Sequence, residues 1–160
     1  MIEKMSLYFT GEKQESLLFI TVGILSIAVA AWLFIQSHRL KSMAFPLVTI
    51  ALIQLIVGGS VYFRTDNQLS TLAKQSIEAP NQFKAEESKR MEVVMKNFAI
   101  YKWIEISLIF IGGGLILLIK NSDWAVGIGA GLVLQSAFML CLDMFAEARG
   151  QDYLEILNKF

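Results

Sequence analysis

The chain has 160 residues, of which 55% are hydrophobic, and its 14 basic and 14 acidic side chains give a formal net charge of zero. Balanced charge argues against nucleic-acid binding. The apolar residues form long runs that polar residues do not break every three or four positions, so the composition is typical of an integral membrane protein.

The first long apolar run predicts a transmembrane helix at about residues 17–36. Residues 1–15 mix charged and apolar side chains, which is typical of a short interfacial helix that ends before Gly11. The small residues at 28–30 resemble the cleavage site of a signal peptide. Because the hydrophobic run continues beyond them to Ile35, we expect a first span that is not cleaved.

A second run predicts a span at about residues 44–63, with Pro46 in the first turn, where a helix tolerates proline. The connection before it contains His38, Arg39 and Lys41 and no acidic residue. Such a loop is typical of the cytoplasmic side of a membrane, so this loop alone argues for termini on the other side.

The polar segment 64–97 has apolar residues at helical spacing on both sides of Pro80. If the chain turns there, the two apolar stripes face each other, pairing Ile77 with Phe83, Leu69 with Met91 and Tyr62 with Phe98. We therefore predict that spans two and three extend beyond the membrane as an antiparallel helical hairpin of about 20 Å. Two short helices lying flat on the headgroups are the alternative.

The third and fourth spans are predicted at about residues 98–119 and 124–144, as antiparallel neighbours joined by a short linker. Glycines lie at matching depths from this linker, Gly112 with Gly131 and Gly114 with Gly129. Gly127 and Gly131 also form a GxxxG pattern. The two helices are therefore expected to approach closely at these glycines.

Residues 145–160 repeat an amphipathic pattern and predict a C-terminal helix. The sequence thus predicts an all-helical membrane protein of four spans, with both termini and the hairpin on one side. Basic residues on that side outnumber those on the two short loops, which favours an inner membrane with both termini in the cytoplasm.

An acidic residue, Glu105, intrudes into the third span, where a carboxylate needs a partner. Lys102 and Tyr101 are within reach on its own helix. Arg64 and Asp143 end their spans at a similar depth. We predict a charged cluster at the membrane boundary on the terminal side, formed by Arg64, Lys102, Glu105 and Asp143 and bordered by Tyr62, Tyr101, Glu147 and Arg149.

This cluster has one structural and three functional interpretations. Ion pairs that fix the register of the bundle are the structural one. A protonatable transport residue, an anionic headgroup site and a carboxylate metal site are the functional ones, and the metal site is the poorest because the single histidine, His38, lies on the other side. No metal or cofactor is expected: the paired histidines of a haem site and the Glu-x-x-His motif of a di-iron bundle are missing.

Three further residues in the spans have simpler interpretations. Gln54 and Gln135 are mid-span amides suited to hydrogen bonds between helices. Cys141, which has no second cysteine to pair with, is expected to be a packed small residue.

The chain is similar in length and span count to the four-span glutathione-linked enzymes, but it lacks the arginine, asparagine and glutamate of their second span, where Gln54 stands alone. The leading prediction is a non-enzymatic accessory or interaction protein that engages a membrane-protein partner, or itself, through the helical hairpin. The alternative is a binder or transporter of a small molecule or lipid that uses Arg64, Glu105 and Asp143. An enzyme acting on a membrane-resident substrate is the third.

Overall fold

The computed structural model describes residues 1–36 and 40–159, and this part of the chain forms four long helices joined by short connections. They are α1 (Ile2–Gln36), α2 (Ala44–Glu78), α3 (Pro80–Leu118) and α4 (Asp123–Lys159), with a short 3-10 helix, η1 (Lys41–Met43), before α2. Each long helix includes a stretch long and apolar enough to cross a membrane, which confirms the predicted four-helix, all-α class. His38 and Arg39 of the basic connection, and Phe160 of the predicted C-terminal helix, lie outside the described residues.

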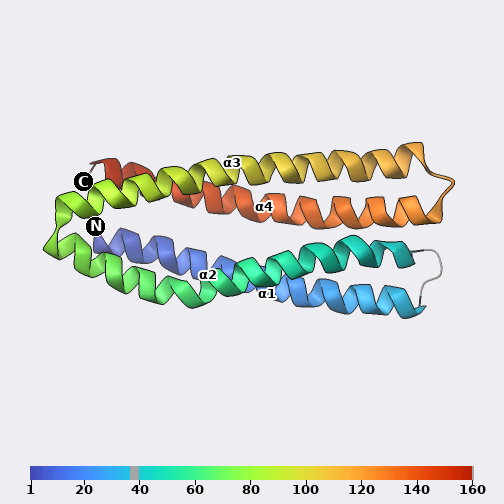
Figure 1. Cartoon of the computed structure of the whole chain (residues 1–160), viewed down its shortest axis with the longest axis horizontal. Coiled ribbons are helices and arrows are strands. Elements are labelled where there is room, and N and C mark those ends of the chain that lie inside the picture. The colour runs from blue at the N-terminus through green and yellow to red at the C-terminus, as the bar shows by residue number, and fades with distance from the viewer. Residues whose placement is uncertain (37–39, 160) are drawn as a thin grey trace.

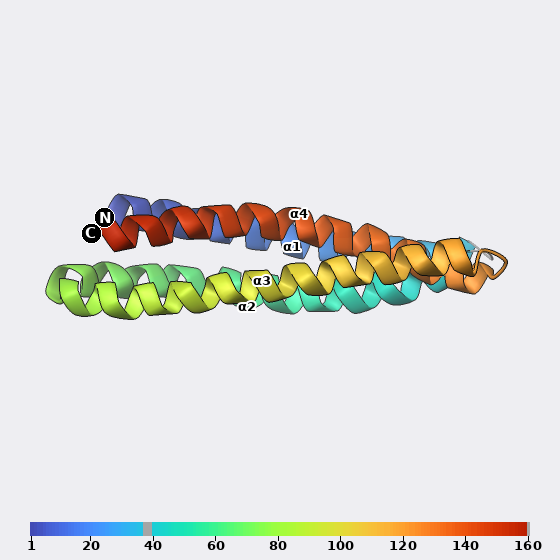
Figure 2. The same ribbon diagram turned by 90° about the horizontal axis from the view of Figure 1, so that it is seen from above.

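The four helices run alongside one another as two antiparallel pairs. Figure 1 shows α1 against α2 and α3 against α4, and both pairs are in contact over much of their length. Figure 2 shows α1 and α4 in one layer and α2 and α3 in the other. Helix α4 also contacts α1, α2 and η1, so it joins the two pairs. Helix α3 packs mainly on α4 and touches α2 at few points. It meets α1 through side chains in the polar end of the bundle, where Phe83 and Met91 share a core with Phe9.

The spacing of buried residues explains why such long helices stay together. On α1 and α2 the buried positions recur at alternating steps of three and four, the pattern that keeps one face turned to a partner in a left-handed bundle. On α1 these positions include Phe9, Ser16, Phe19, Gly23, Ser26, Ala30 and Leu33. On α2 they include Ala44, Leu47, Ala51, Gln54 and Gly58, so polar and small residues continue the same face.

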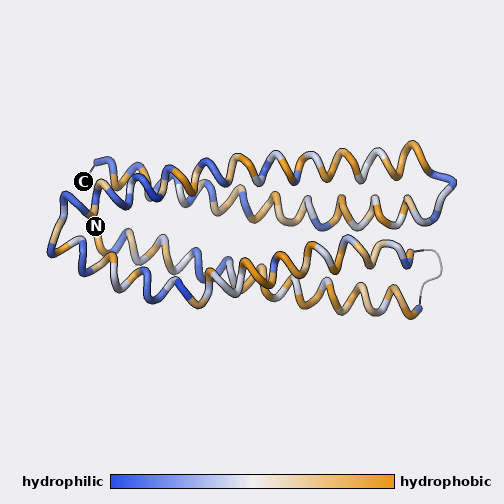
Figure 3. Tube along the Cα trace, viewed as in Figure 1, coloured by the Kyte–Doolittle hydropathy of each residue, from blue (hydrophilic) through white to orange (hydrophobic). Residues whose placement is uncertain are grey.

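All four helices continue into the polar end, which holds both termini and the turn at Ala79 (Figure 3). Two predictions are corrected here: α1 passes through Gly11 without a break, and residues 145–159 continue α4 rather than forming a separate helix. We call this end the cap and define it as residues 2–16, 64–97 and 145–159. Its core draws on α1, α3 and α4, and consists of Met5, Tyr8, Phe9, Phe83, Met91, Tyr153 and Leu157.

The predicted hairpin of α2 and α3 is therefore part of a larger bundle. Leu69 and Met91 do enter one core, as expected, but Ile77 is 70% exposed and does not cover Phe83. Phe83 is fully buried because α1 and α4 supply the surface against which it packs. The turn itself follows from Ala79, whose backbone is not helical, and from Pro80 at the first position of α3, where the missing amide hydrogen is not needed.

The glycines bring α3 and α4 together in a different register from the one predicted. Gly112 faces the backbone carbonyl of Gly129, and Gly129 faces that of Gly112, so neither position has room for a side chain. Gly127 and Gly131 instead lie against η1 and the start of α2, next to Ser42, Met43 and Pro46. Gly114 has open space where a side chain would be.

A buried hydrogen-bond network joins three helices in the middle of the spans. The amide of Gln135 on α4 donates to Gln54 Oε1 on α2 at 2.9 Å and to Ser26 Oγ on α1 at 3.1 Å. The hydrogen bonds expected of the two glutamines therefore form, and they tie the α1–α2 pair to α4. Cys141, by contrast, is exposed on α4 rather than packed.

Candidate functional site

Charged side chains from all four helices meet at the boundary between the spans and the cap. Helix α1 contributes two acids that the sequence analysis did not include, Glu12 and Glu15. We call the whole set the charged layer: Glu12 and Glu15 on α1, Arg64 on α2, Lys102 and Glu105 on α3, and Asp143, Glu147 and Arg149 on α4.

Each of the three basic residues of the charged layer is paired with a different acid. Lys102 Nζ lies 2.7 Å from Glu147 Oε1, which joins α3 to α4. Arg149 Nη2 lies 2.5 Å from Glu15 Oε2, which joins α4 to α1. Arg64 is 57% exposed and lies 3.5 Å from Glu12 rather than near Glu105. The structure therefore brings Lys102 and Glu147 together as neighbours, but separates Arg64 from the predicted centre of the cluster.

Gly11 explains how Arg149 reaches across α1. A side chain at this position would meet the Arg149 side chain, with its Cδ 2.7 Å from the added Cβ. The bare backbone of Gly11 therefore provides the space through which the guanidinium reaches Glu15. A glycine interpreted from sequence as the end of a helix serves here as a contact surface inside one.

Glu105 and Asp143 form the centre of the charged layer and face each other between α3 and α4. Their carboxyl groups are within hydrogen-bonding reach of one another. Glu105 is only 5% exposed and Asp143 only 6%. Both carboxylate oxygens of Glu105 are buried without a hydrogen-bond donor among the described residues. Two buried carboxylates that lie close together repel each other unless a positive charge or a hydrogen lies between them.

The acids that surround this pair on the cap side are themselves shifted by burial. Burial raises the pKa of Glu12 and of Glu15, although Arg64 and Arg149, respectively, act in the opposite direction. Glu15 and Glu147 also add negative charge near Asp143. The charged layer therefore has more acids than bases, and the excess is concentrated at Glu105 and Asp143.

The two predicted border tyrosines lie outside this centre. Tyr101 is 47% exposed on α3. The ring of Tyr62 lies 4.9 Å from Lys13 Nζ, whose amine also pairs with Asp66 at 2.6 Å. Glu12 is not part of the predicted cluster. It lies on the same face of α1 as Phe9 and Ser16, and this helical spacing is the sequence feature that places Glu12 toward the other helices.

A second buried charge network lies in the core of the cap. Glu87 is 1% exposed and accepts two hydrogen bonds of 2.7 Å from the guanidinium of Arg90. It also accepts one of 3.2 Å from the hydroxyl of Tyr153, and Arg90 lies 5.6 Å above the ring of Phe9. The sequence signal for this network is the four-residue step from Phe83 to Glu87, which places an acid on the apolar stripe.

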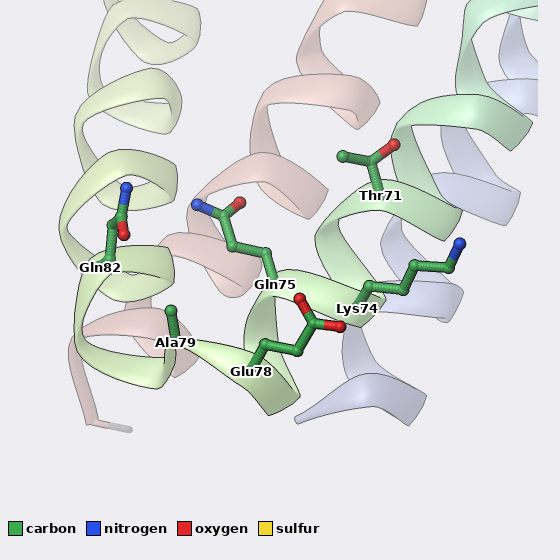
Figure 4. Close-up of a pocket in the computed structure, with 6 residues that line it drawn as sticks. All are labelled: Thr71, Lys74, Gln75, Glu78, Ala79 and Gln82. Carbon is green, nitrogen blue, oxygen red and sulfur yellow. The ribbon is translucent and has the colours of Figure 1, made fainter.

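The surface of the described chain has a polar hollow on the cap and an apolar groove on the spans. The hollow, of about 550 Å³, lies open at the tip of the cap beside the α2–α3 turn (Figure 4). It has mixed polar lining, formed by Thr71, Lys74, Gln75, Glu78, Ala79 and Gln82. The groove, of about 440 Å³, lies between α1 and α2. Residues 1–36 and 40–159 contain no group of three or more histidine, cysteine or acidic side chains arranged to hold a metal ion.

These features define a class: an all-helical protein with four helices of membrane-spanning length and a charged layer below a helical cap. Comparisons of the chain with protein-family models, with curated proteins and with solved structures find no match. The function is therefore inferred from the chemistry of its own side chains.

Proposed function

We propose that this is a proton-linked membrane protein, in which the Glu105–Asp143 pair binds and releases a proton and thereby alters the packing of α3 on α4. The observation that carries the proposal is a buried carboxyl group, Glu105, whose two oxygens have no hydrogen-bond donor among the described residues and which interacts with another acid, Asp143. An ionisable residue at membrane depth is costly, which is why such residues mark proton pathways in transporters and pumps.

The composition of the charged layer favours a proton over the other two ligands. An anionic headgroup would need free basic residues, but Lys102 and Arg149 already pair with Glu147 and Glu15. Calcium and magnesium ions take six or more oxygen ligands, and the two carboxyl groups supply only part of such a set. A single proton, in contrast, lets one carboxyl donate a hydrogen bond to the other and removes their repulsion.

The first test measures thermal stability against pH in detergent. Unfolded carboxyl groups lose their protons near pH 4, whereas the folded pair retains one above that pH, so the folded state binds more protons. Stability should therefore fall as the pH rises through the range in which the pair releases this proton. Glu105→Gln replaces the shared proton by an amide that can donate to Asp143 at every pH. The thermal stability of this variant should therefore decrease much less with rising pH than that of the wild type.

The controls separate the pair from the other charges of the charged layer. Glu92→Gln removes an exposed acid from the same helix and should keep the wild-type slope. Glu12 and Glu15 contribute a smaller slope of the same sign in every variant, because burial raises their pKa. Equal slopes in the wild type, Glu105→Gln and Asp143→Asn contradict the proposal. A slope that depends on sodium would assign the pair to a cation instead of a proton.

A second candidate is an accessory protein that associates with another membrane protein or with itself, through the cap or through α3. The observation that favours it is the exposure of the third span: 11% of its most apolar stretch is buried, against 28 to 33% in the other three. Trp103 and Phe110 are more than 70% exposed on this helix. A stoichiometric partner or a defined oligomer in native mass spectrometry would support this function.

We further propose that the protein lies in a bacterial-type inner membrane with both termini in the cytoplasm. The basis is the larger number of basic residues on the terminal side of the spans. An alkaline phosphatase fused after Phe160 should be inactive, since this enzyme matures only in the periplasm. An active fusion would reverse the orientation and leave the four-helix fold unchanged.

A further inference from the structure

The apolar groove between α1 and α2 lies near the connection of these helices, at the end of the spans away from both termini (Figure 1). It has a volume of about 440 Å³. Its lining includes Ala30 and Ala44, which are small and buried. Phe34 and Phe45 border it and are 57% and 58% exposed. Along α1 the groove extends over residues 27–35, about 12 Å at the rise of a helix.

A basic side chain lies next to this groove. Lys41 begins η1, immediately before α2, and its Nζ is 5.9 Å from the centre of the Phe34 ring. The groove therefore combines an apolar slot between two helices of membrane-spanning length with a positive charge near the ends of these helices. An anionic phospholipid has the same two parts in the same order, a hydrocarbon chain below a phosphate.

We propose that this groove binds one anionic phospholipid, with an acyl chain along Ala30, Ala31 and Ala44 and its phosphate at Lys41. Small residues between two aromatic side chains allow a chain to lie closer to the helix backbones than it would on an ordinary lipid-facing surface. The amine of Lys41 then selects a negative headgroup. The site lies at the opposite end of the spans from Glu105, so it does not depend on the proton-linked function.

The test uses two matched pairs of variants. Ala31→Leu fills the groove, whereas Ala28→Leu adds the same side chain to an exposed position on α1 that does not line it. Lys41→Gln removes the charge beside the groove, and Lys120→Gln removes one from the loop between α3 and α4. Each purified protein is mixed with equal amounts of phosphatidylglycerol and phosphatidylcholine of identical acyl chains, and retained lipid is counted by native mass spectrometry.

The wild type, Ala28→Leu and Lys120→Gln should retain one phosphatidylglycerol in preference to phosphatidylcholine. Lys41→Gln should still retain lipid, but its preference for phosphatidylglycerol over phosphatidylcholine should be about fivefold weaker than that of the wild type. This factor corresponds to about 1 kcal/mol for one basic residue at the membrane surface. Ala31→Leu should retain neither lipid. Retention by Ala31→Leu equal to that of Ala28→Leu, or an unchanged headgroup preference in Lys41→Gln, would overturn the site.

Discussion

Replacing Arg90 by methionine should destabilise the cap by about 3 kcal/mol or more, because it leaves Glu87 buried without its counter-charge. Glu87 is 1% exposed, and the hydroxyl of Tyr153 alone cannot compensate a full negative charge. Hydrogen exchange measured by mass spectrometry over residues 80–97 reports the loss locally. Exchange in this segment should accelerate by about a hundredfold, the factor that corresponds to roughly 3 kcal/mol.

Two further variants show whether the effect comes from the buried charge. Lys89→Met removes an exposed basic residue immediately before Arg90, and it should change the free energy of unfolding by less than about 0.5 kcal/mol. The double variant with methionine at both 87 and 90 should recover most of the loss, since no unpaired charge remains in the core. Equal exchange in Arg90→Met and Lys89→Met would show that the Glu87–Arg90 pair does not stabilise the cap.

Gly112→Ala should separate α3 from α4 and cost about 1 to 3 kcal/mol, the usual range for overpacking a close contact. The added methyl group would lie 2.7 Å from the backbone oxygen of Gly129, which cannot move aside as a flexible side chain can. Unfolding in mixed detergent micelles, followed by circular dichroism, measures the change.

The adjacent residue supplies the matched control. Gly113 has no heavy atom within 4 Å of the place where a side chain would begin, so Gly113→Ala should be neutral, or stabilising by up to about 1 kcal/mol through its helix propensity. If both substitutions have the same sign, the contact between Gly112 and Gly129 does not set the distance between the helices.

The sequence predicts the spans well because lipid allows little choice. Long apolar runs must satisfy their own backbone hydrogen bonds, so four runs predict four helices, and Pro46 and Pro80 mark two helix starts. The helix register is harder to predict. Counting outward from the α3–α4 linker assumes helices that are parallel and evenly wound, and it pairs Gly112 with Gly131 instead of Gly129.

The charged layer illustrates the same limit. Glu105, Asp143, Lys102 and Glu147 could be predicted because two neighbouring helices hold them at similar depths. The role of α1 is harder to predict, because its first 15 residues mix acidic, basic and apolar side chains as a surface segment does. Only the buried face that continues from Phe9 to Ser16 shows that α1 enters the cap and supplies Glu12 and Glu15.

Infrared spectroscopy tests the proton on the Glu105–Asp143 pair most directly, because a protonated carboxyl group has a carbonyl stretch distinct from that of a carboxylate. At neutral pH the wild-type protein should show this acid band, and the band should shift when the sample is transferred to heavy water. It should disappear in Glu105→Gln and in Asp143→Asn and persist in Glu92→Gln. If the wild type shows no acid band at neutral pH, or if its acid band persists unchanged in both Glu105→Gln and Asp143→Asn, the Glu105–Asp143 pair holds no proton.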